Sequence, residues 1–152
     1  MLAEREIEEK LKSHLAVTGY RAVTSRGGVQ VEDADDIGTI AIGVGVRQHD
    51  AFSLPTVNVS GAVAVATRKE MDLSGARHDA AVDAVIGKLA RLHDYPEELA
   101  ALFAGEDASF IPAAIRLDGG AVTSRTNEIA TDTINFTLRG VITPPVTQNQ
   151  AE

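Results

Sequence analysis

The feature that most constrains the fold lies in residues 57–92. Apolar residues there first recur at every second position and then about every 3.6 positions. In the first part, branched residues occupy every second position: Val57, Val59, Val63 and Val65. Because successive side chains of a strand point to opposite sides of a sheet, this spacing predicts a strand with one apolar face. After a polar connection at 67–75, apolar residues recur at three- and four-residue steps, which predicts one amphipathic helix. The helix stripe consists of Ala81, Val82, Val85, Ile86, Leu89 and Leu92. A strand followed by such a helix indicates a structural scaffold.

Composition indicates one globular domain with an aliphatic core. The chain has 152 residues, of which 44% are hydrophobic and only 4% aromatic, and tryptophan is absent. A chain of this length buries roughly two thirds of its unfolded surface. The core must therefore be built from Val, Ile, Leu and Ala, which offers few aromatic platforms for stacking bases or sugars.

Charge and cysteine usage exclude several classes of function. The formal net charge of −8 argues against tight nucleic-acid binding, since that requires clustered Lys and Arg. There is no cysteine, so disulfides, thiolate metal sites and cysteine nucleophiles are excluded. The acidic N-terminus lacks the features of a secretory signal, and no apolar stretch is long enough to span a bilayer. We expect no membrane association and a protein that stays in the compartment where it is made.

The N-terminal part predicts a helix and one further strand. Apolar residues at four-residue spacing indicate a helix over residues 2–15, with Gly19 as its stop signal. Residues 20–31 predict an irregular strand or a hairpin around Gly27 and Gly28, and the acidic run 32–36 predicts a solvated loop. In residues 39–46, large apolar residues alternate with small ones, which predicts a strand. The face that carries the small residues includes glycines, which indicates a bulge or a close contact there.

The C-terminal part returns to strands after a short helix. Pro96 begins this helix, and Asp94 or Tyr95 is its expected cap. Two strands follow, one with Ile111, Ala113, Ile115 and Leu117 on one face and the other with Ile134, Phe136, Leu138, Gly140 and Ile142. Between them, residues 118–132 are too long and polar for a tight turn and predict a mobile loop or a projecting hairpin.

These elements predict an α/β (α+β) fold with a single domain over residues 1–143. We expect a mainly antiparallel sheet packed against helices on one face. Residues 144–152, with two prolines and a polar end, have no apolar pattern and predict a disordered tail.

Three of the four histidines precede an aspartate, at 49–50, 78–79 and 93–94. A small metal-dependent hydrolase built on His78, Asp79 and Asp83 is therefore one hypothesis. However, consecutive helix residues point about 100° apart, so His78 and Asp79 do not converge on one ligand unaided. Roles at helix ends explain these residues better, with Asp72 or Ser74 as the cap of the main helix. We expect no catalytic residue, metal or cofactor.

Charged residues in the C-terminal part are the candidates for contacts with a neighbouring subunit. Arginines there can pair with acids of another chain or can be solvated residues of a strand face or loop. The candidate interface residues are Arg116, Arg125, Arg139, Asp118 and Glu128.

The order of predicted elements resembles a known family. The first helix, the two valine- and isoleucine-rich strands, the helix beginning near residues 74–82 and the strand at 132–140 are similar to the small tail-completion proteins of bacteriophages. The resemblance covers residues 2–142 and is to lambda-type tail terminators. It implies an α/β protomer, six copies of which form a ring that caps the tail tube and receives the head connector.

The resemblance implies a virion structural protein that is present in the host cytoplasm during assembly. Its partners would be further copies of itself, the tail tube protein and the head–tail connector. A neck adaptor or another minor tail protein is the alternative within this class. The hydrolase described above and a host binding domain are the alternatives from other classes.

Overall fold

The computed structural model describes residues 2–25, 36–49, 56–105, 108–119 and 122–142. The expected turn at Gly27 and Gly28, most of the acidic loop and the tail at 144–152 lie outside these residues. In chain order the elements are α1 (Leu2–His14), β1 (Tyr20–Thr24), β2 (Gly38–His49), β3 (Thr56–Arg68), the 3₁₀ turn η1 (Lys69–Met71), α2 (Ala76–Asp94), α3 (Pro96–Phe103), β4 (Phe110–Leu117), β5 (Val122–Arg125) and β6 (Ile129–Ile142).

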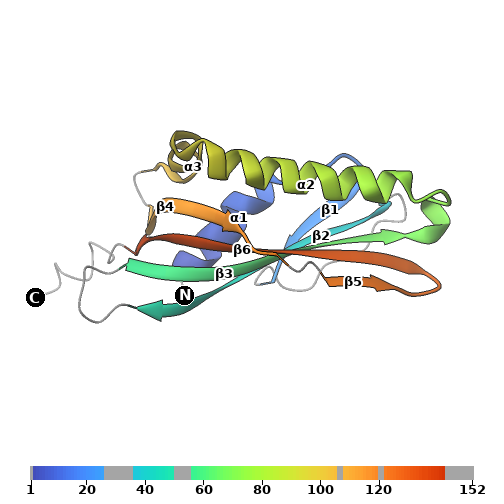
Figure 1. The fold of residues 1–152 in the computed structure, drawn as a ribbon, viewed down its shortest axis with the longest axis horizontal. Helices are drawn as coiled ribbons and strands as arrows, with labels where there is room; N and C mark the ends of the chain where they lie inside the picture. The colour runs from blue at the N-terminus through green and yellow to red at the C-terminus, as the bar shows by residue number, and fades with distance from the viewer. Residues whose placement is uncertain (1, 26–35, 50–55, 106–107, 120–121, 143–152) are drawn as a thin grey trace, which may run out of the picture.

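The strands form one six-stranded sheet, and the three helices lie on one face of it (Figure 1). The strand order is β1-β2-β3-β6-β4, with β5 paired to β6. All pairs are antiparallel except β1 with β2, which is parallel. The predicted single-domain α+β fold with a mainly antiparallel sheet is confirmed. The strand at residues 20–24 is also confirmed, but it does not form a hairpin with the next described strand, because the two run in the same direction.

The core lies between the sheet and the helices and follows the alternation of the two central strands. Val59 pairs with Leu138 and Val63 with Ile134, and all four side chains are buried. Between these pairs, Gly61 lies opposite Phe136, and a Cβ at residue 61 would come within 2.6 Å of the Phe136 ring. The missing side chain thus makes room for a fully buried aromatic ring.

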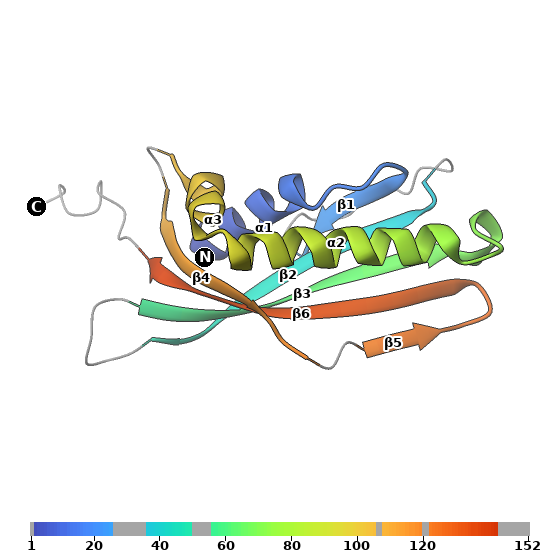
Figure 2. The same cartoon turned by 45° about the horizontal axis from the view of Figure 1, so that its top comes forward.

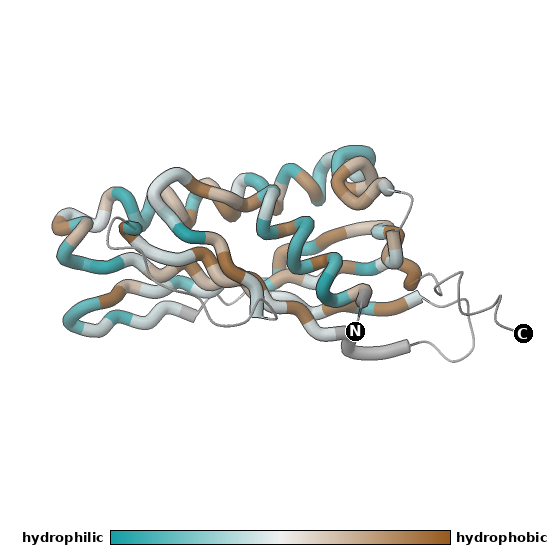
Figure 3. Tube along the Cα trace, turned by 180° about the vertical axis from the view of Figure 1, so that it is seen from behind, coloured by the Kyte–Doolittle hydropathy of each residue, from teal (hydrophilic) through white to brown (hydrophobic). Residues whose placement is uncertain are grey.

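The helices contribute the other half of the core. Ile7, Leu11 and Leu15 are fully buried along α1 and the turn after it, and Val85 and Leu89 are fully buried on α2. The trace coloured by hydropathy shows hydrophilic and hydrophobic residues alternating along these helices (Figure 3). The predicted helical stripes are therefore confirmed, although Ile86 lies at the margin of its stripe with 37% exposure.

The predicted apolar face of β4 is wrong at its beginning. Ile111 is 55% exposed, whereas Phe110 and Ile115 are buried. The cause is a register shift between Pro112 and Ala114, since an extra residue in a strand reverses which side chains face the core. Proline has no amide hydrogen to donate to a ladder, so a bulge in an edge strand suits it.

The opposite face of the sheet, called the open face below, is not covered by any described helix (Figure 2). On β3 and β6 its residues are small or polar: Asn58, Ser60, Ala62, Ala64, Ala66, Thr131, Thr133, Asn135, Thr137 and Arg139. Residues 122–142 form the projecting hairpin β5–β6, one of the two structures expected for the polar segment 118–132. Its expected mobility remains a prediction.

Candidate functional site

A chain of hydrogen-bonded polar side chains crosses the covered face at the N-terminal end of α2. The hydroxyl of Tyr20 on β1 lies 2.7 Å from Oγ1 of Thr67 on β3. That Oγ1 lies 2.6 Å from Nδ1 of His78 on α2. The other ring nitrogen, Nε2, lies 2.8 Å from Oδ2 of Asp132 on β6. Four elements that are distant in sequence are joined in this way.

Asp72 fixes the start of α2 and thereby the direction of His78. Its carboxylate accepts the backbone amides of Arg77 at 3.1 Å and His78 at 2.9 Å. In addition, the Oγ of Ser74 accepts the backbone amide of Ala76 at 3.3 Å. The N-cap position itself is Gly75, but both residues proposed as caps accept amides of the first turn, and Asp72 satisfies two that have no partner within the helix. By contrast, Tyr95, at the N-cap position of α3, makes no capping bond through its side chain.

Gly38 gives the Tyr20 ring its position. The two residues are partners in the parallel β1–β2 ladder. A Cβ at residue 38 would lie 2.9 Å from Cε2 of Tyr20 and 2.9 Å from the Cα of Thr67. With glycine there, the ring lies close to the sheet and its hydroxyl reaches Thr67.

Asp132 is the anionic end of this series of hydrogen-bonded side chains. Burial opposes its ionisation, but hydrogen bonds from Thr123, His78 and Arg125 outweigh burial and lower its pKa to about 2. Thr123 donates to Oδ1 at 2.7 Å, and the guanidinium of Arg125 lies 3.3 Å from Oδ2. The carboxylate is therefore ionised at neutral pH and accepts the hydrogen on Nε2 of His78.

Each hydrogen bond in this series of side chains can be given one donor and one acceptor without conflict. With the hydrogen of a neutral ring on Nε2, Nδ1 accepts from the Thr67 hydroxyl, which in turn accepts from the Tyr20 hydroxyl. His78 is only 2% exposed and Thr67 only 1%. Because both ring nitrogens are occupied and the ring is buried, the arrangement holds four elements together and leaves His78 no position for a substrate.

The residues of the hydrolase hypothesis do not converge. His78 points into the protein, whereas Asp79 and Asp83 lie on the exposed side of α2. Within the described residues, no group of three or more His, Cys, Asp or Glu side chains is arranged to hold a metal ion. The geometry gives this hypothesis no support.

The other histidine pairs contribute little to a site. Nδ1 of His93 donates to the backbone carbonyl of Ile115 at 2.7 Å, which attaches the end of α2 to β4. The adjacent Asp94 is exposed. The side chain of His49 and all of Asp50 lie outside the described residues.

Three of the five predicted interface residues come together on the open face near β4. Arg116 donates from Nε to Asp118 at 3.0 Å, and both residues also bond to the hydroxyl of Thr137. Arg139 is exposed nearby and forms no ion pair or hydrogen bond with any described side chain. Arg116 and Arg139 border an open pocket of about 840 Å³, which Asn58, Ser60 and His93 also line.

The other two predicted residues belong to the projecting hairpin. Arg125 binds Asp132 on the covered side and is 43% exposed at its side chain. Glu128 is exposed in the turn, and its backbone carbonyl accepts the amide of Lys69 at 2.8 Å. The structure therefore divides the predicted interface residues between the open face and the hairpin.

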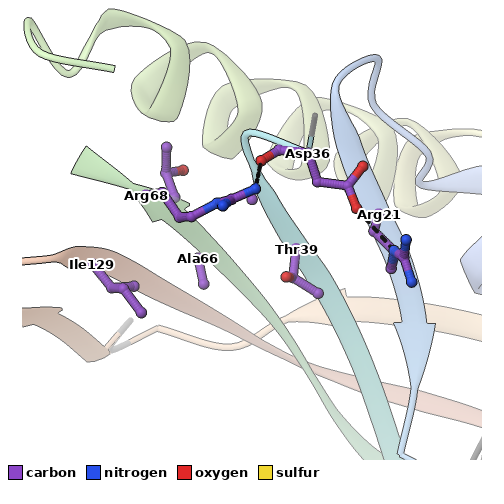
Figure 4. A pocket seen from close by; sticks show the side chains of 8 residues that line it. Arg21, Asp36, Thr39, Ala66, Arg68 and Ile129 are labelled. Carbon is purple, nitrogen blue, oxygen red and sulfur yellow. Dashed lines mark hydrogen bonds and ion pairs between the residues drawn. The ribbon is translucent and has the colours of Figure 1, made fainter. Parts of the chain in front are cut away.

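Arginines also lie at the other end of the open face (Figure 4). Arg21 on β1 forms an ion pair with Asp36 at 2.9 Å, and Arg68 on β3 donates to the backbone carbonyl of the same aspartate. Together with Thr39, Ala66 and Ile129, among others, they line a small pocket of about 60 Å³. The open face thus has small side chains at its centre and guanidinium groups at both ends.

The sequence alone did not predict the buried series of hydrogen-bonded side chains, because its contacts join residues that are distant in sequence. Asp132 and His78 are separated by 54 positions, and Thr67 and Tyr20 by 47. One signal was present in the sequence. Asp132 lies an even number of positions from Ile134 and Phe136, so its carboxylate falls on the apolar side of the strand.

In comparisons with known proteins, no family model matches the chain, and no curated protein shows significant similarity to it. None of the described helices is both long and apolar enough to cross a membrane.

Proposed function

We propose that this protein is a virion structural protein, a tail terminator that forms a ring on the end of a bacteriophage tail tube and joins it to the head connector. The proposal rests on the resemblance of the predicted element order to lambda-type tail terminators. The observation that carries it is the open face, a large sheet surface without a described cover, in a protein whose polar residues Thr67 and His78 are buried on the other face.

The open face suits contact with another protein. Its central side chains are Ala, Ser and Thr, which allow another backbone to approach closely and carry no charge that must be desolvated. The arginines at its ends, of which Arg116 and Arg139 are exposed, are of the residue type that is enriched at protein interfaces. A ring of identical subunits requires such a surface, together with a second surface that matches it.

The buried polar chain fits a structural role in the same proposal. Hydrogen bonds from four elements meet at Thr67, His78 and Asp132, where they fix the position of α2 on the sheet. A subunit that must match its neighbours around a ring benefits from such fixed geometry, since a polar network fully satisfied by hydrogen bonds holds one arrangement of the core.

The test is assembly with and without tail tubes. Light scattering across a range of protein concentrations should show association toward a hexamer, and electron microscopy should show the protein on one end of purified tubes. A protein that stays monomeric at every concentration and never binds a tube end would exclude the proposed function. Binding along the tube or at a neck complex instead would favour the minor tail protein or neck adaptor.

A further inference from the structure

The outer surface of α2 carries a stripe of small and acidic residues directly opposite its buried side. The stripe consists of Ala76, Asp79, Ala80, Asp83 and Gly87, all of them exposed. At 100° per residue these positions fall within one narrow sector of the helix, whereas the buried residues His78, Ala81, Val85, Leu89 and Leu92 occupy the opposite sector. We call these exposed residues the outer ridge.

The outer ridge has unused negative charge. Asp79 and Asp83 form no ion pair or hydrogen bond with any described side chain. Two like charges four residues apart on a helix surface repel each other slightly. Two basic residues of α2 are directed elsewhere: Lys88 donates to the carbonyl of Ala16, and Arg91 forms an ion pair with Glu98.

The open face has the opposite charge. Its described strand residues include Arg21, Arg68, Arg116 and Arg139 and no aspartate or glutamate, although the whole chain has a net charge of −8. The carboxylates at its margins, Asp36 and Asp118, each bind one of these arginines. Arg139 keeps its charge without a partner among the described residues.

The spacings on the two surfaces also match. Arg139 pairs with Ala114 and Thr137 with Arg116, so the two arginines are diagonal neighbours on adjacent strands, about 7–8 Å apart. Asp79 and Asp83 are one helical turn apart, or about 6 Å along the axis. Two carboxylates on a helix can therefore each meet one guanidinium on the sheet.

From the charges and spacings we infer that the outer ridge of one copy of this chain docks on the open face of a second copy. Asp79 and Asp83 then pair with Arg116 and Arg139 of the neighbour, in the open pocket next to β4. Ala76, Ala80 and Gly87 let the helix lie close to Asn58 and Ser60 of that neighbour. This inference rests on the proposed ring and specifies the interface that would close it.

The positions of the two surfaces suit a ring. The helix layer and the open face lie on opposite sides of the protomer (Figures 1 and 2). A contact between two different surfaces of identical subunits is heterologous, and it produces a closed ring when the rotation per subunit divides a full turn. Such a contact also leaves the covered face, with its buried polar chain, unchanged.

Charge reversal in two variants tests the inference. Variant one carries Arg116→Glu and Arg139→Glu, and variant two carries Asp79→Lys and Asp83→Lys. In either variant alone, the two surfaces have the same sign, so the apparent dissociation constant in sedimentation velocity should rise at least tenfold. In an equimolar mixture, each surface of one variant meets an opposite surface of the other, and assemblies of wild-type size should return.

A control separates this effect from net charge. Arg5→Glu with Lys12→Glu on α1 changes the net charge as much as variant one and should leave association unchanged. Circular dichroism should show that all variants keep the wild-type fold, since every substituted side chain lies at the surface.

The outcomes separate the interface from the proposed function. If the wild type assembles and variant one assembles equally well, or if the mixture fails to restore assembly, the inferred interface is wrong and the terminator proposal stands. If the wild type assembles only on tube ends, the same comparison is made there by electron microscopy. A wild type that neither associates nor binds tube ends overturns both.

Discussion

The two faces of the sheet use the same strands in opposite ways. On the covered face, Val59, Phe136 and Leu138 are completely buried. Their immediate neighbours in sequence, such as Ser60, Asn135 and Thr137, lie on the open face and are small or polar. The comparison teaches that the buried side chains of the covered face stabilise the fold, whereas the small and polar side chains of the open face contribute little to the core.

The covered face combines apolar packing with a buried polar chain. Burying an aliphatic or aromatic side chain contributes roughly 1.5–3 kcal/mol, and buried polar groups cost free energy unless they are hydrogen-bonded. Thr67 and His78 are both bonded, so they fix the position of α2 without that penalty. No such network is present among the described residues at the centre of the open face, so side-chain changes there should leave the protomer intact.

The largest effect should come from truncating an aromatic ring on the covered face. We expect Phe136→Ala to lower the free energy of unfolding by about 3–5 kcal/mol, because it leaves a cavity above Gly61. The matched change on the open face, Asn135→Ala, should stay within about 0.5 kcal/mol. Urea unfolding of dilute protein measures both. Similar losses for the two variants would contradict the distinction between the faces.

Glycines on the two faces provide the second comparison. A Cβ at Gly61 would collide with the Phe136 ring, so Gly61→Ala should destabilise the protomer by about 1–3 kcal/mol. Gly45 on β2 has open space where its Cβ would lie, and alanine in a strand is preferred to glycine by about 0.5–1 kcal/mol. Gly45→Ala should therefore be neutral or stabilising. The same unfolding measurement decides, and a stabilising Gly61→Ala would show that the ring can move aside.

Removing the charge of Asp132 should give a pH-dependent loss. Its pKa of about 2 in the folded protein lies below the ordinary 3.8, so ionisation favours the folded state above pH 4, and this advantage disappears as the pH falls toward 2. The difference corresponds to at most about 2 kcal/mol at pH 7 and to about half of that at pH 3, because solvent screens part of the interaction. We therefore expect Asp132→Asn to be destabilised by about 1–2 kcal/mol at pH 7 and by less at pH 3.

The control for this measurement is Asp83→Asn in dilute protein. Asp83 is exposed and unpaired within the described chain, so its substitution should change stability little at either pH. An Asp132→Asn variant whose deficit is the same at pH 3 and pH 7 would mean that the carboxylate charge contributes nothing through His78 and Arg125.

The predictable part of the fold is the part set by local periodicity. The repeat of Ile7, Leu11 and Leu15 identified α1, and the alternating valines identified β3 with its buried side. These signals lie within one turn of a helix or one strand, so neighbouring residues suffice to detect them. The interface candidates Arg116 and Arg139 were found by residue type, and the structure adds that they are neighbours.

The parts that escaped prediction depend on contacts between distant segments. The register shift at Pro112 reverses the face of Ile111, and no local rule places a bulge there. Glu8 is 1% exposed on α1 because its Oε2 accepts the hydroxyl of Ser25 and the amide of Val44. A buried glutamate of this kind can be recognised only when the strand that it binds is in place.

A smaller effect should distinguish the two aspartates at the start of α2. Asp72 accepts two backbone amides and is buried, so Asp72→Ala should lower the free energy of unfolding by about 1–2 kcal/mol. Asp79 in the first turn is exposed and interacts only with the helix dipole, so Asp79→Ala should cost about 0.3–1 kcal/mol at low salt. Thermal unfolding at low and high salt measures this. The Asp79→Ala deficit should shrink with salt, and equal, salt-independent deficits would contradict the capping role.

The smallest effect on protomer stability concerns the projecting hairpin. β5 has four residues and pairs only with β6, whereas β3 is paired along its length on both sides. Amides on the outer edge of β5 should therefore exchange with solvent after local opening, well before those of β3, which require global unfolding. If the hairpin contacts a neighbour or the tail tube, assembly should slow exchange at residues 122–125 and leave β3 unchanged. Hydrogen exchange on free and assembled protein, read by mass spectrometry, provides the comparison. Strong protection of β5 already in the free protomer would mean that the hairpin is simply part of the monomer fold, and the expected ordering on assembly would be wrong.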